Sequence, residues 1–270
     1  MSDITLVTMF YNIGRENWDL YPRKVKEYID AFETFLKYNY KMVIFIDDRY
    51  YDQLNEKLQN SQYKDNKTLI PINEQWLFDN LWSWSRLDKE REIMESKKYK
   101  SLVQHRINRS YPENTNPLYT ILTHSKIDVV NYVIENNLTE DEYLAWVDFG
   151  YFYDKMTSEF LPKDTLDINK LNKDKFNICL INYISSADRE ILYTLQTAPE
   201  KIGAYFFFAS KSVHKEFQQL AHEWLITFQD HYNIADDEQA IWLQCYFDRP
   251  ELFELHTFFK WHQALKVFSK

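Results

Sequence analysis

The stretch YLAWVDFGYF, residues 143–152, closes an apolar run with a single acid, Asp148, followed two residues later by Gly150. The chain holds only 3 glycines in 270 residues, against an average usage of roughly 7%. A sequence that avoids glycine so strongly is expected to keep it where a side chain cannot be tolerated. The pattern predicts a buried strand whose carboxyl end presents an acid beside a closely approached backbone.

Five further apolar runs are short and continuous, and with residues 144–149 they give six predicted strands, the others at 4–11, 42–46, 68–72, 177–181 and 202–209. Continuous apolar runs are typical of a sheet that is covered on both faces. Segments with the apolar spacing of one helical face separate most of these runs, at 25–38, 118–135 and 211–231. This alternation predicts an α/β fold with a mostly parallel sheet flanked by helices.

Residues 74–110 interrupt the alternation between the third and fourth predicted strands. They contain no glycine or proline, which predicts an inserted helical layer. The chain shows no internal repeat, low-complexity segment or linker rich in proline, glycine and serine. We therefore expect a single domain over residues 1–270.

The overall composition bounds the function. The net charge of −9 argues against non-specific nucleic-acid binding, which needs a basic surface. Cys179 and Cys245 each lie in apolar runs, which predicts buried, reduced thiols. No stretch reaches 18 apolar residues, and the first predicted strand begins directly after residues 1–3. These features predict a cytoplasmic protein.

Three predicted strands end in acidic or polar residues, at 10–15, 45–48 and 146–150. In open parallel sheets, ligands bind beyond the carboxyl ends of the strands. A lone acid after a strand is more often a turn residue or a helix N-cap than a ligand. Three such ends in one sheet favour a binding edge over that alternative.

Most familiar site motifs are absent from the sequence. It contains no GxGxxG, no GxxxxGK[ST], no GxSxG and no HExxH. The triplet Asp148-Phe149-Gly150 spells the magnesium motif of protein kinases, but the other kinase motifs are missing. The scattered histidines and cysteines do not have the spacing of a zinc site. The remaining interpretation is a sheet that binds a nucleotide without a glycine-rich loop.

Six segments together carry a family resemblance: VTMFYNIGRENW (7–18), MVIFIDD (42–48), NPLYTILTHSK (116–126), WVDFGYF (146–152), KIGAYFFFASK (201–211) and DDEQAIWLQCY (236–246). Their order and spacing resemble the bacterial HtrL/YibB family, which is similar to GT-A glycosyltransferases. The resemblance covers most of the chain. It implies a GT-A-like fold and transfer of a sugar from a nucleotide-sugar, with a UDP-sugar as the default donor.

The resemblance also implies a setting for this activity. The acceptor would be a saccharide or a lipid-linked saccharide in the synthesis of a bacterial capsule, O-antigen or lipooligosaccharide. The C-terminal segment HTFFKWHQALKVFSK, residues 256–270, is aromatic and basic. It is interpreted as a packing helix or, alternatively, as an interfacial segment that touches the inner face of the cytoplasmic membrane.

GT-A enzymes usually hold Mn²⁺ or Mg²⁺ through an Asp-x-Asp at a strand end, and the resemblance places WVDFG there. Asp148 would be the surviving acid of that motif, with Phe149 and Gly150 standing where the second acid is expected. Gly150 would let the backbone pass close to the diphosphate or the sugar; the alternative is a turn residue in the left-handed region. His262 is the candidate for a further metal contact, and His256 is a second one.

The resemblance assigns the donor site to the first two strands and the residues that follow them. The base and ribose would lie along Thr8, Phe10, Tyr11 and Asn12. Arg15 would meet the diphosphate, or alternatively form a surface salt bridge. Asp47 or Asp48 would accept a hydrogen bond from uracil, or alternatively cap the helix that follows.

Two more donor contacts are implied further along the chain. Lys126 lies on the helix before the WVDFG strand, where GT-A enzymes often place a basic residue; a solvated helix face is the alternative. Gly203 falls where a small residue often lies beside the donor sugar, and a core strand is the alternative.

Asp237 and Glu238 are the catalytic candidates. GT-A enzymes often place an acid here, and an inverting transfer needs one general base to deprotonate the acceptor hydroxyl. The alternative is that both acids only stabilise a helix start.

Two rival functions remain open. The first is a non-catalytic nucleotide-sugar-binding or scaffold protein that keeps the fold, which the incomplete Asp-x-Asp favours. The second is a nucleotidyltransferase, which the absence of a basic, glycine-rich loop after the first strand disfavours.

Overall fold

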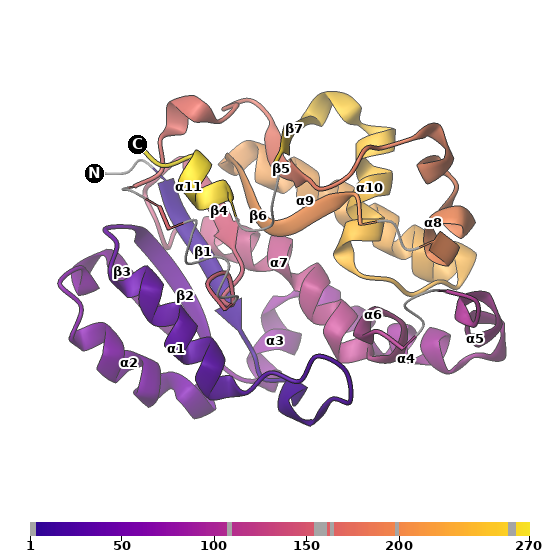
Figure 1. Cartoon of the computed structure of the whole chain (residues 1–270), viewed down its shortest axis with the longest axis horizontal. Coiled ribbons are helices and arrows are strands. Elements are labelled where there is room, and N and C mark those ends of the chain that lie inside the picture. The colour runs from indigo at the N-terminus through magenta and orange to yellow at the C-terminus, as the bar shows by residue number, and fades with distance from the viewer. Residues whose placement is uncertain (1–3, 107–109, 154–160, 163–164, 198–199, 259–262) are drawn as a thin grey trace.

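A computed structural model describes residues 4–106, 110–153, 161–162, 165–197, 200–258 and 263–270. Its centre is a seven-stranded sheet in the order β3-β2-β1-β4-β6-β5-β7 (Figure 1). β6 runs antiparallel to both of its neighbours, and the remaining strands share one direction. The predicted α/β class, with a mostly parallel sheet flanked by helices, is confirmed.

All six predicted strands form, with boundaries within two residues of those expected. They are β1 (Ile4–Phe10), β2 (Lys41–Asp47), β3 (Lys67–Ile72), β4 (Tyr143–Val147), β5 (Phe176–Leu180) and β6 (Ile202–Ser210). Strands β1, β4 and β6 are almost wholly buried, which explains why their sequences are continuously apolar.

One strand was not expected. β7 (Phe253–Thr257) pairs in parallel with β5 at the edge of the sheet. Its sequence FELHT mixes charged and apolar residues, because an edge strand is only partly covered. The interpretation of residues 256–270 as one packing helix is therefore wrong at its start, and only α11 (Ala264–Val267) is helical among the described residues there.

Two hydrophobic clusters cover the two faces of the sheet. One face packs against α1 (Val25–Leu36), α2 (Tyr51–Gln59) and α11 (Figure 1). The other packs against α7 (Pro117–Glu135), α8 (Ile191–Thr197), α9 (Lys211–Ile226) and α10 (Glu238–Asp248). Both cysteines are buried and unpaired, as expected. Among the described residues, no helix is long and apolar enough to cross a bilayer.

The predicted helical insertion is present. It comprises α3 (Glu74–Asn80), a 3-10 segment (Trp82–Arg86), α4 (Leu87–Glu95) and α5 (Lys97–Val103), and the short α6 (Pro112–Thr115) follows it. Asn73 begins the layer, because its side chain accepts a hydrogen bond from the Trp76 amide as an N-cap. The 3-10 segment and α4 of the insertion pack on α7.

The strand order reverses between β1 and β4, since β2 and β3 lie on one side of β1 and the rest of the sheet on the other. Open α/β sheets form their ligand crevice at such a switch point, beyond the carboxyl ends of the strands. The segments that follow β1, β2 and β4 therefore meet where a site is expected.

Candidate functional site

Asp47, at the end of β2, ties together the segments that follow β1 and β2. Its side chain is fully buried and accepts hydrogen bonds from the amides of Asn12, at 3.1 Å, and Arg49, at 3.1 Å. The Arg49 guanidinium also pairs with this carboxylate. The helix-cap alternative describes Asp47 correctly, whereas Asp48 is exposed to solvent.

Asn12 and Gly14 shape the turn after β1. The side-chain oxygen of Asn12 accepts a hydrogen bond from the Gly14 amide at 2.9 Å, and its side-chain nitrogen donates to the Tyr50 hydroxyl. Gly14 has a φ of 77°, the left-handed region that favours glycine. The turn then places Arg15, which donates to the Tyr28 hydroxyl at 3.0 Å.

Thr8 and Phe10, predicted to line the base and ribose, lie in the interior of the protein, as does Phe149 of the WVDFG strand end. The Phe10 ring lies 5.0 Å from the Phe149 ring, which stacks on Phe32 at 4.2 Å. Thr8 is fully buried in β1, and no described residue bonds its hydroxyl. Phe10 and Phe149 therefore have a packing role in this structure, which corrects the expectation of direct ligand contact for both rings.

Tyr11 directly follows β1 and is partly buried. Its ring meets Trp84 edge-on at 5.8 Å, and the Arg49 guanidinium lies 5.8 Å from its ring centre. Burial, aided by the negative charges of Glu74 and Asp47, raises the pKa of its hydroxyl.

A buried chain of charges connects β4 to α10. The Lys126 ammonium on α7 lies 2.9 Å from Oδ1 of Asp148 and 2.8 Å from Oε1 of Glu238, and it donates to the Ala204 carbonyl at 3.2 Å. Trp146 also donates to Oδ1 of Asp148, at 2.7 Å. Lys126 is therefore not on a solvated helix face, and we name this group the Lys126 cluster: Lys126, Asp148 and Glu238.

The cluster holds its lysine charged. Burial lowers the pKa of Lys126, but the carboxylates of Asp148 and Glu238 outweigh burial and raise it above the ordinary value. Within the described residues, the second oxygen of Glu238 is buried without a hydrogen-bond partner. The Asp148 side chain keeps 34% of its surface exposed, so one carboxylate of the cluster faces solvent at the switch point.

Gly150 and Gly203 are required by their neighbours and not by backbone conformation. A Cβ at Gly150 would lie 2.8 Å from the Tyr28 ring, and one at Gly203 would lie 2.5 Å from the Tyr205 ring. Neither glycine has a positive φ, so the left-handed turn suggested for Gly150 is wrong. The close approach expected at Gly150 comes from an aromatic ring of this chain.

Asp237 is the N-cap of α10 and accepts a hydrogen bond from the Gln239 amide at 3.1 Å. It also lines a pocket of about 220 Å³ between α6, α7, α8 and the residues that follow β1. Burial, and then the charge of Glu238, raise the pKa of Asp237 well above the usual range. Of the two catalytic candidates, only Asp237 lines this pocket.

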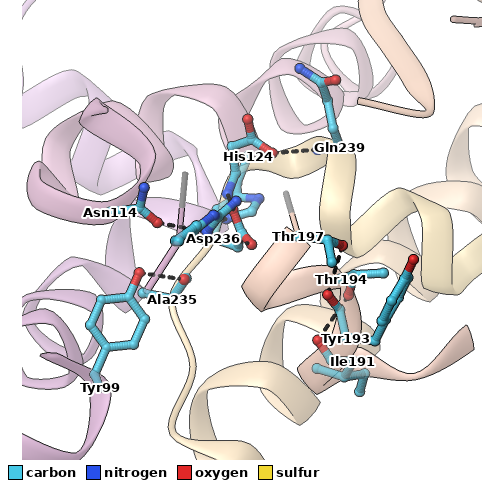
Figure 2. A network of polar contacts seen from close by, with 12 residues as sticks. Tyr99, Asn114, His124, Ile191, Tyr193, Thr194, Thr197, Ala235, Asp236 and Gln239 are labelled. Carbon is cyan, nitrogen blue, oxygen red and sulfur yellow. Dashed lines mark hydrogen bonds and ion pairs between the residues drawn. The ribbon is translucent and has the colours of Figure 1, made fainter. Parts of the chain in front are cut away.

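The pocket wall contains a buried ion pair that no sequence motif indicated. Arg106 lies 3.2 Å from Asp236, and it donates to Asn114 at 2.6 Å. In Figure 2, Asp236 lies on one side with Asn114 beside it, and Thr194 of α8 lies on the other; Asp236 and Thr194 both line the pocket. Arg106 lies within the predicted insertion and belongs to no motif, so nothing in the sequence indicated that it pairs with Asp236.

Of the residues expected to bind a metal ion, the structure describes Asp148 and His256 but not His262. Among the described residues, no group of three or more histidine, cysteine, aspartate or glutamate side chains could hold a metal ion. Asp148 commits Oδ1 to Lys126 and Trp146, and its single remaining oxygen does not make a divalent site by itself. His256 instead bonds Asn177 at 2.9 Å, and His262 lies outside the described residues. The divalent cation stays a prediction.

The protein has a mixed α/β fold, and charged side chains gather at its strand switch point. The chain belongs to the family described as "Bacterial protein of unknown function (HtrL_YibB)", whose family model matches residues 2–270. It is 25% identical over 277 residues to Protein HtrL of Escherichia coli K12, covering 99% of this chain and 93% of that protein. The predicted family is confirmed.

Two solved structures are similar at a distance, each at 10% sequence identity. One is mouse xyloside xylosyltransferase 1 in its apo form, with a TM-score of 0.43 and coverage of 95% of this chain and 85% of the other. The second is the glycosyltransferase GlyE of Streptococcus pneumoniae TIGR4, with a TM-score of 0.38 and coverage of 94% and 45%. Both likenesses are too distant to place individual residues.

Proposed function

We propose that this chain is a glycosyltransferase that moves a sugar from a nucleotide-sugar, with UDP as the nucleotide, to a saccharide acceptor. The single observation that supports this most is the Lys126 cluster, which joins the strand switch point to the acid-lined pocket through adjacent residues. The family resemblance to GT-A enzymes supports the same reaction. We place it in bacterial surface-polysaccharide synthesis on that resemblance alone.

The donor would lie over the carboxyl ends of β1, β2 and β4. Asp148 offers a partly exposed carboxylate there, and Asp48 an exposed one. Arg15 supplies a guanidinium, whose planar donors suit a diphosphate. We assign donor contact to Asn12, Arg15, Asp48 and Asp148, and we assign Asp47 to holding the loops in place.

The acceptor hydroxyl would be deprotonated by Asp237. A general base works best when its pKa lies near the working pH, and the raised pKa of Asp237 moves a carboxyl in that direction. Glu238 is less suited, because Oε1 is committed to Lys126 and the side chain is almost fully buried. We therefore assign Glu238 and Lys126 to positioning Asp148 relative to α10.

A divalent cation, if bound, would stabilise the charge of the leaving diphosphate. Asp148 is the described residue that would contact it, through the oxygen not bonded to Lys126. The roles given to Arg15, Asp148 and Asp237 do not depend on that ion.

A thermal-shift panel tests the proposal with UDP, GDP, CMP and dTDP, each with and without Mn²⁺. A ligand that binds the native state raises the melting temperature by mass action, and we expect the largest rise with UDP. Asp148→Asn should reduce the rise, whereas Asp88→Asn, which changes an acid that is 93% exposed on α4, should not. No shift with any nucleotide at millimolar concentration contradicts the proposal.

The non-catalytic alternative keeps one supporting observation, the single acid at the WVDFG strand end. It predicts UDP binding without turnover. Release of UDP from a panel of UDP-sugars, with and without added glycosides, separates the two functions, because a scaffold releases none.

A further inference from the structure

We propose that the 220 Å³ pocket beside Asp237 binds one sugar ring that carries no negative charge, and that it disfavours anionic sugars. The pocket is the binding site of the acceptor only if the protein is the proposed transferase. Binding of a sugar in the pocket does not depend on that function. We name it the Asp237 pocket. Residues of the segment after β1 and of α6, α7, α8 and α10 line it, among them Tyr21, Tyr111, Tyr119, Asp237 and Gln239.

The size of the pocket suits a single ring. Pockets for drug-sized ligands begin at roughly 300 Å³, and the Asp237 pocket is smaller, at about 220 Å³. It is also adjacent to the Lys126 cluster, since Asp237 lines the pocket and the next residue, Glu238, bonds Lys126. A ring held here would present a hydroxyl beside the proposed donor edge.

Tyrosines form one wall of the pocket. The Tyr21 and Tyr111 rings meet edge to face at 5.3 Å, and their hydroxyls are joined by a hydrogen bond of 2.8 Å. Tyr119 lines the same pocket, and its ring meets Trp18 edge-on at 5.9 Å. Tyrosine offers both an apolar face and a polar hydroxyl, which matches the apolar and hydroxylated faces of a sugar ring.

Tyr21 holds its place at a conformational cost. Its φ is 53°, a left-handed conformation that is rare for a bulky residue, and its side chain is largely exposed. Such strained conformations concentrate at active sites and ligand-binding sites. The hydrogen bond to Tyr111 spans 90 residues of sequence, so it connects the segment after β1 to the start of α6 within this wall.

The charges that line the pocket select against anions. Four carboxyl groups line it, from Glu113, Glu200, Asp236 and Asp237, against the guanidinium groups of Arg15 and Arg106. The Arg106 guanidinium is committed to Asp236 at 3.2 Å. A uronic acid or phosphorylated sugar would bring a further negative charge beside these carboxyl groups, whose mutual repulsion already raises the pKa of Asp237, and juxtaposed like charges oppose binding.

Polar atoms in the wall are left for the hydroxyl groups of a ligand. Within the described residues, the side-chain oxygen of Gln239 is buried without a hydrogen-bond partner. Asp237 uses Oδ1 to cap α10, which leaves its other oxygen as an acceptor. Buried polar groups are normally satisfied, so both atoms favour a ligand that donates hydrogen bonds, as sugar hydroxyls and ammonium groups do.

Binding of methyl glycosides by saturation-transfer NMR tests the inference without needing turnover. The probes are the methyl glycosides of glucose, glucosamine and glucuronic acid, and of galactose, galactosamine and galacturonic acid. We expect binding of at least one neutral or amino glycoside at millimolar concentration. We expect each uronide to bind about tenfold more weakly than its neutral counterpart, a difference of about 1.4 kcal/mol.

Two variants localise the binding. Tyr111→Ala removes part of the tyrosine wall and should weaken glycoside binding by roughly fivefold or more, and Asp237→Asn should lower the discrimination against uronides. Tyr63→Ala is the matched control, because Tyr63 lies just before the amino end of β3, an outermost strand of the sheet, and does not line the pocket. This variant should leave binding unchanged. Circular dichroism confirms that each variant is folded.

The outcomes separate this inference from the proposed function, because UDP binding is measured in the same samples. UDP binding without binding of any glycoside overturns the inference alone. Glycoside binding without UDP binding overturns the transferase proposal and leaves the pocket as a sugar site. Uronides that bind as tightly as neutral glycosides, or binding that Tyr111→Ala does not change, also overturn the inference.

Discussion

The Lys126 ammonium and the Glu238 carboxylate lie 2.8 Å apart in the interior, with only 12% and 3% of their side-chain surfaces exposed. One residue comes from the middle of α7 and the other from the first turn of α10, 112 positions apart in the sequence. Each charge was expected to contact a ligand, and the structure instead pairs them with one another. Their pairing fixes α10, and with it Asp237, relative to β4, which Asp148 directly follows.

We expect Lys126→Met to destabilise the protein strongly, because it leaves Glu238 charged, buried and unpaired. Removing one partner of a buried ion pair costs about 3–5 kcal/mol. The free energy of unfolding is measured by urea denaturation. The double variant Lys126→Met, Glu238→Gln should recover part of the loss, since it leaves no buried charge at that position. Equal stability of wild type and the single variant would show that the pair contributes nothing.

Asp148→Asn should weaken UDP binding while the fold survives. The variant keeps the side-chain volume and removes the one carboxylate of the Lys126 cluster that reaches solvent, and Lys126 keeps Glu238 as a partner. Calorimetric titration with UDP measures the effect, and we expect a loss of about tenfold or more. Unchanged UDP affinity would reduce Asp148 to a structural partner of Lys126 and Trp146.

Asp237→Asn should lower turnover by roughly 10²–10⁴-fold, the usual contribution of a general base. UDP affinity should hardly change, because Asp237 lines the acceptor pocket. Asparagine still caps a helix well, so stability should fall by at most about 1 kcal/mol. The pH profile offers a second readout. A base must be deprotonated, so the turnover of the wild type should rise with pH through the raised pKa of Asp237.

Loss of that rising limb in Asp237→Asn would support the assignment. Turnover is measured as the release of UDP. If wild type and variant have equal turnover and equal pH profiles, Asp237 is not a catalytic residue.

Glu90 on α4 makes stability depend on pH. It is fully buried, and burial raises its pKa from 4.5 to about 7, although the Gln229 side chain donates to it at 2.6 Å. Between these two values the unfolded chain ionises while the folded protein stays protonated, so stability falls as pH rises from about 4.5 to about 7. The full effect is about 3 kcal/mol at 1.36 kcal/mol per unit of pKa.

Glu90→Gln removes this ionisation and should flatten the dependence. Urea denaturation at pH 5 and pH 8 measures it, with Glu92→Gln, an exposed acid on the same helix, as the control. A variant whose stability falls as much as that of the wild type between these pH values would place the ionisation elsewhere.

Much of the fold was predictable because buried parallel strands have simple sequences. The runs at β1, β2 and β6 are almost purely apolar, and the absence of glycine and proline over residues 74–110 marked the helical layer. β7 was not predicted, because an edge strand needs no continuous apolar run. Its pairing with β5 is decided by tertiary context that FELHT does not contain.

The sequence predicted where the candidate site lies in the fold, but not which contacts its residues make. Strand ends locate the edge, so Asn12, Asp47 and Asp148 were expected there. Their partners were not, because the choice between ligand and internal hydrogen bond depends on residues that are distant in the sequence, as with Arg106 and Asp236. Gly150 is a second example. Because glycine is rare in this chain, Gly150 was expected to lie close to another group, but the sequence did not indicate that this group is the Tyr28 ring.

The most direct test of the central claim is hydrogen–deuterium exchange of the whole chain with and without saturating UDP and Mn²⁺. A donor site at the strand switch point predicts slower exchange in the peptides that contain residues 10–15, 47–50 and 147–151, with little change at the opposite edge of the sheet, around residues 63–67 and 139–143. Nucleotide-dependent protection confined to that opposite edge, or no protection anywhere, would contradict the account.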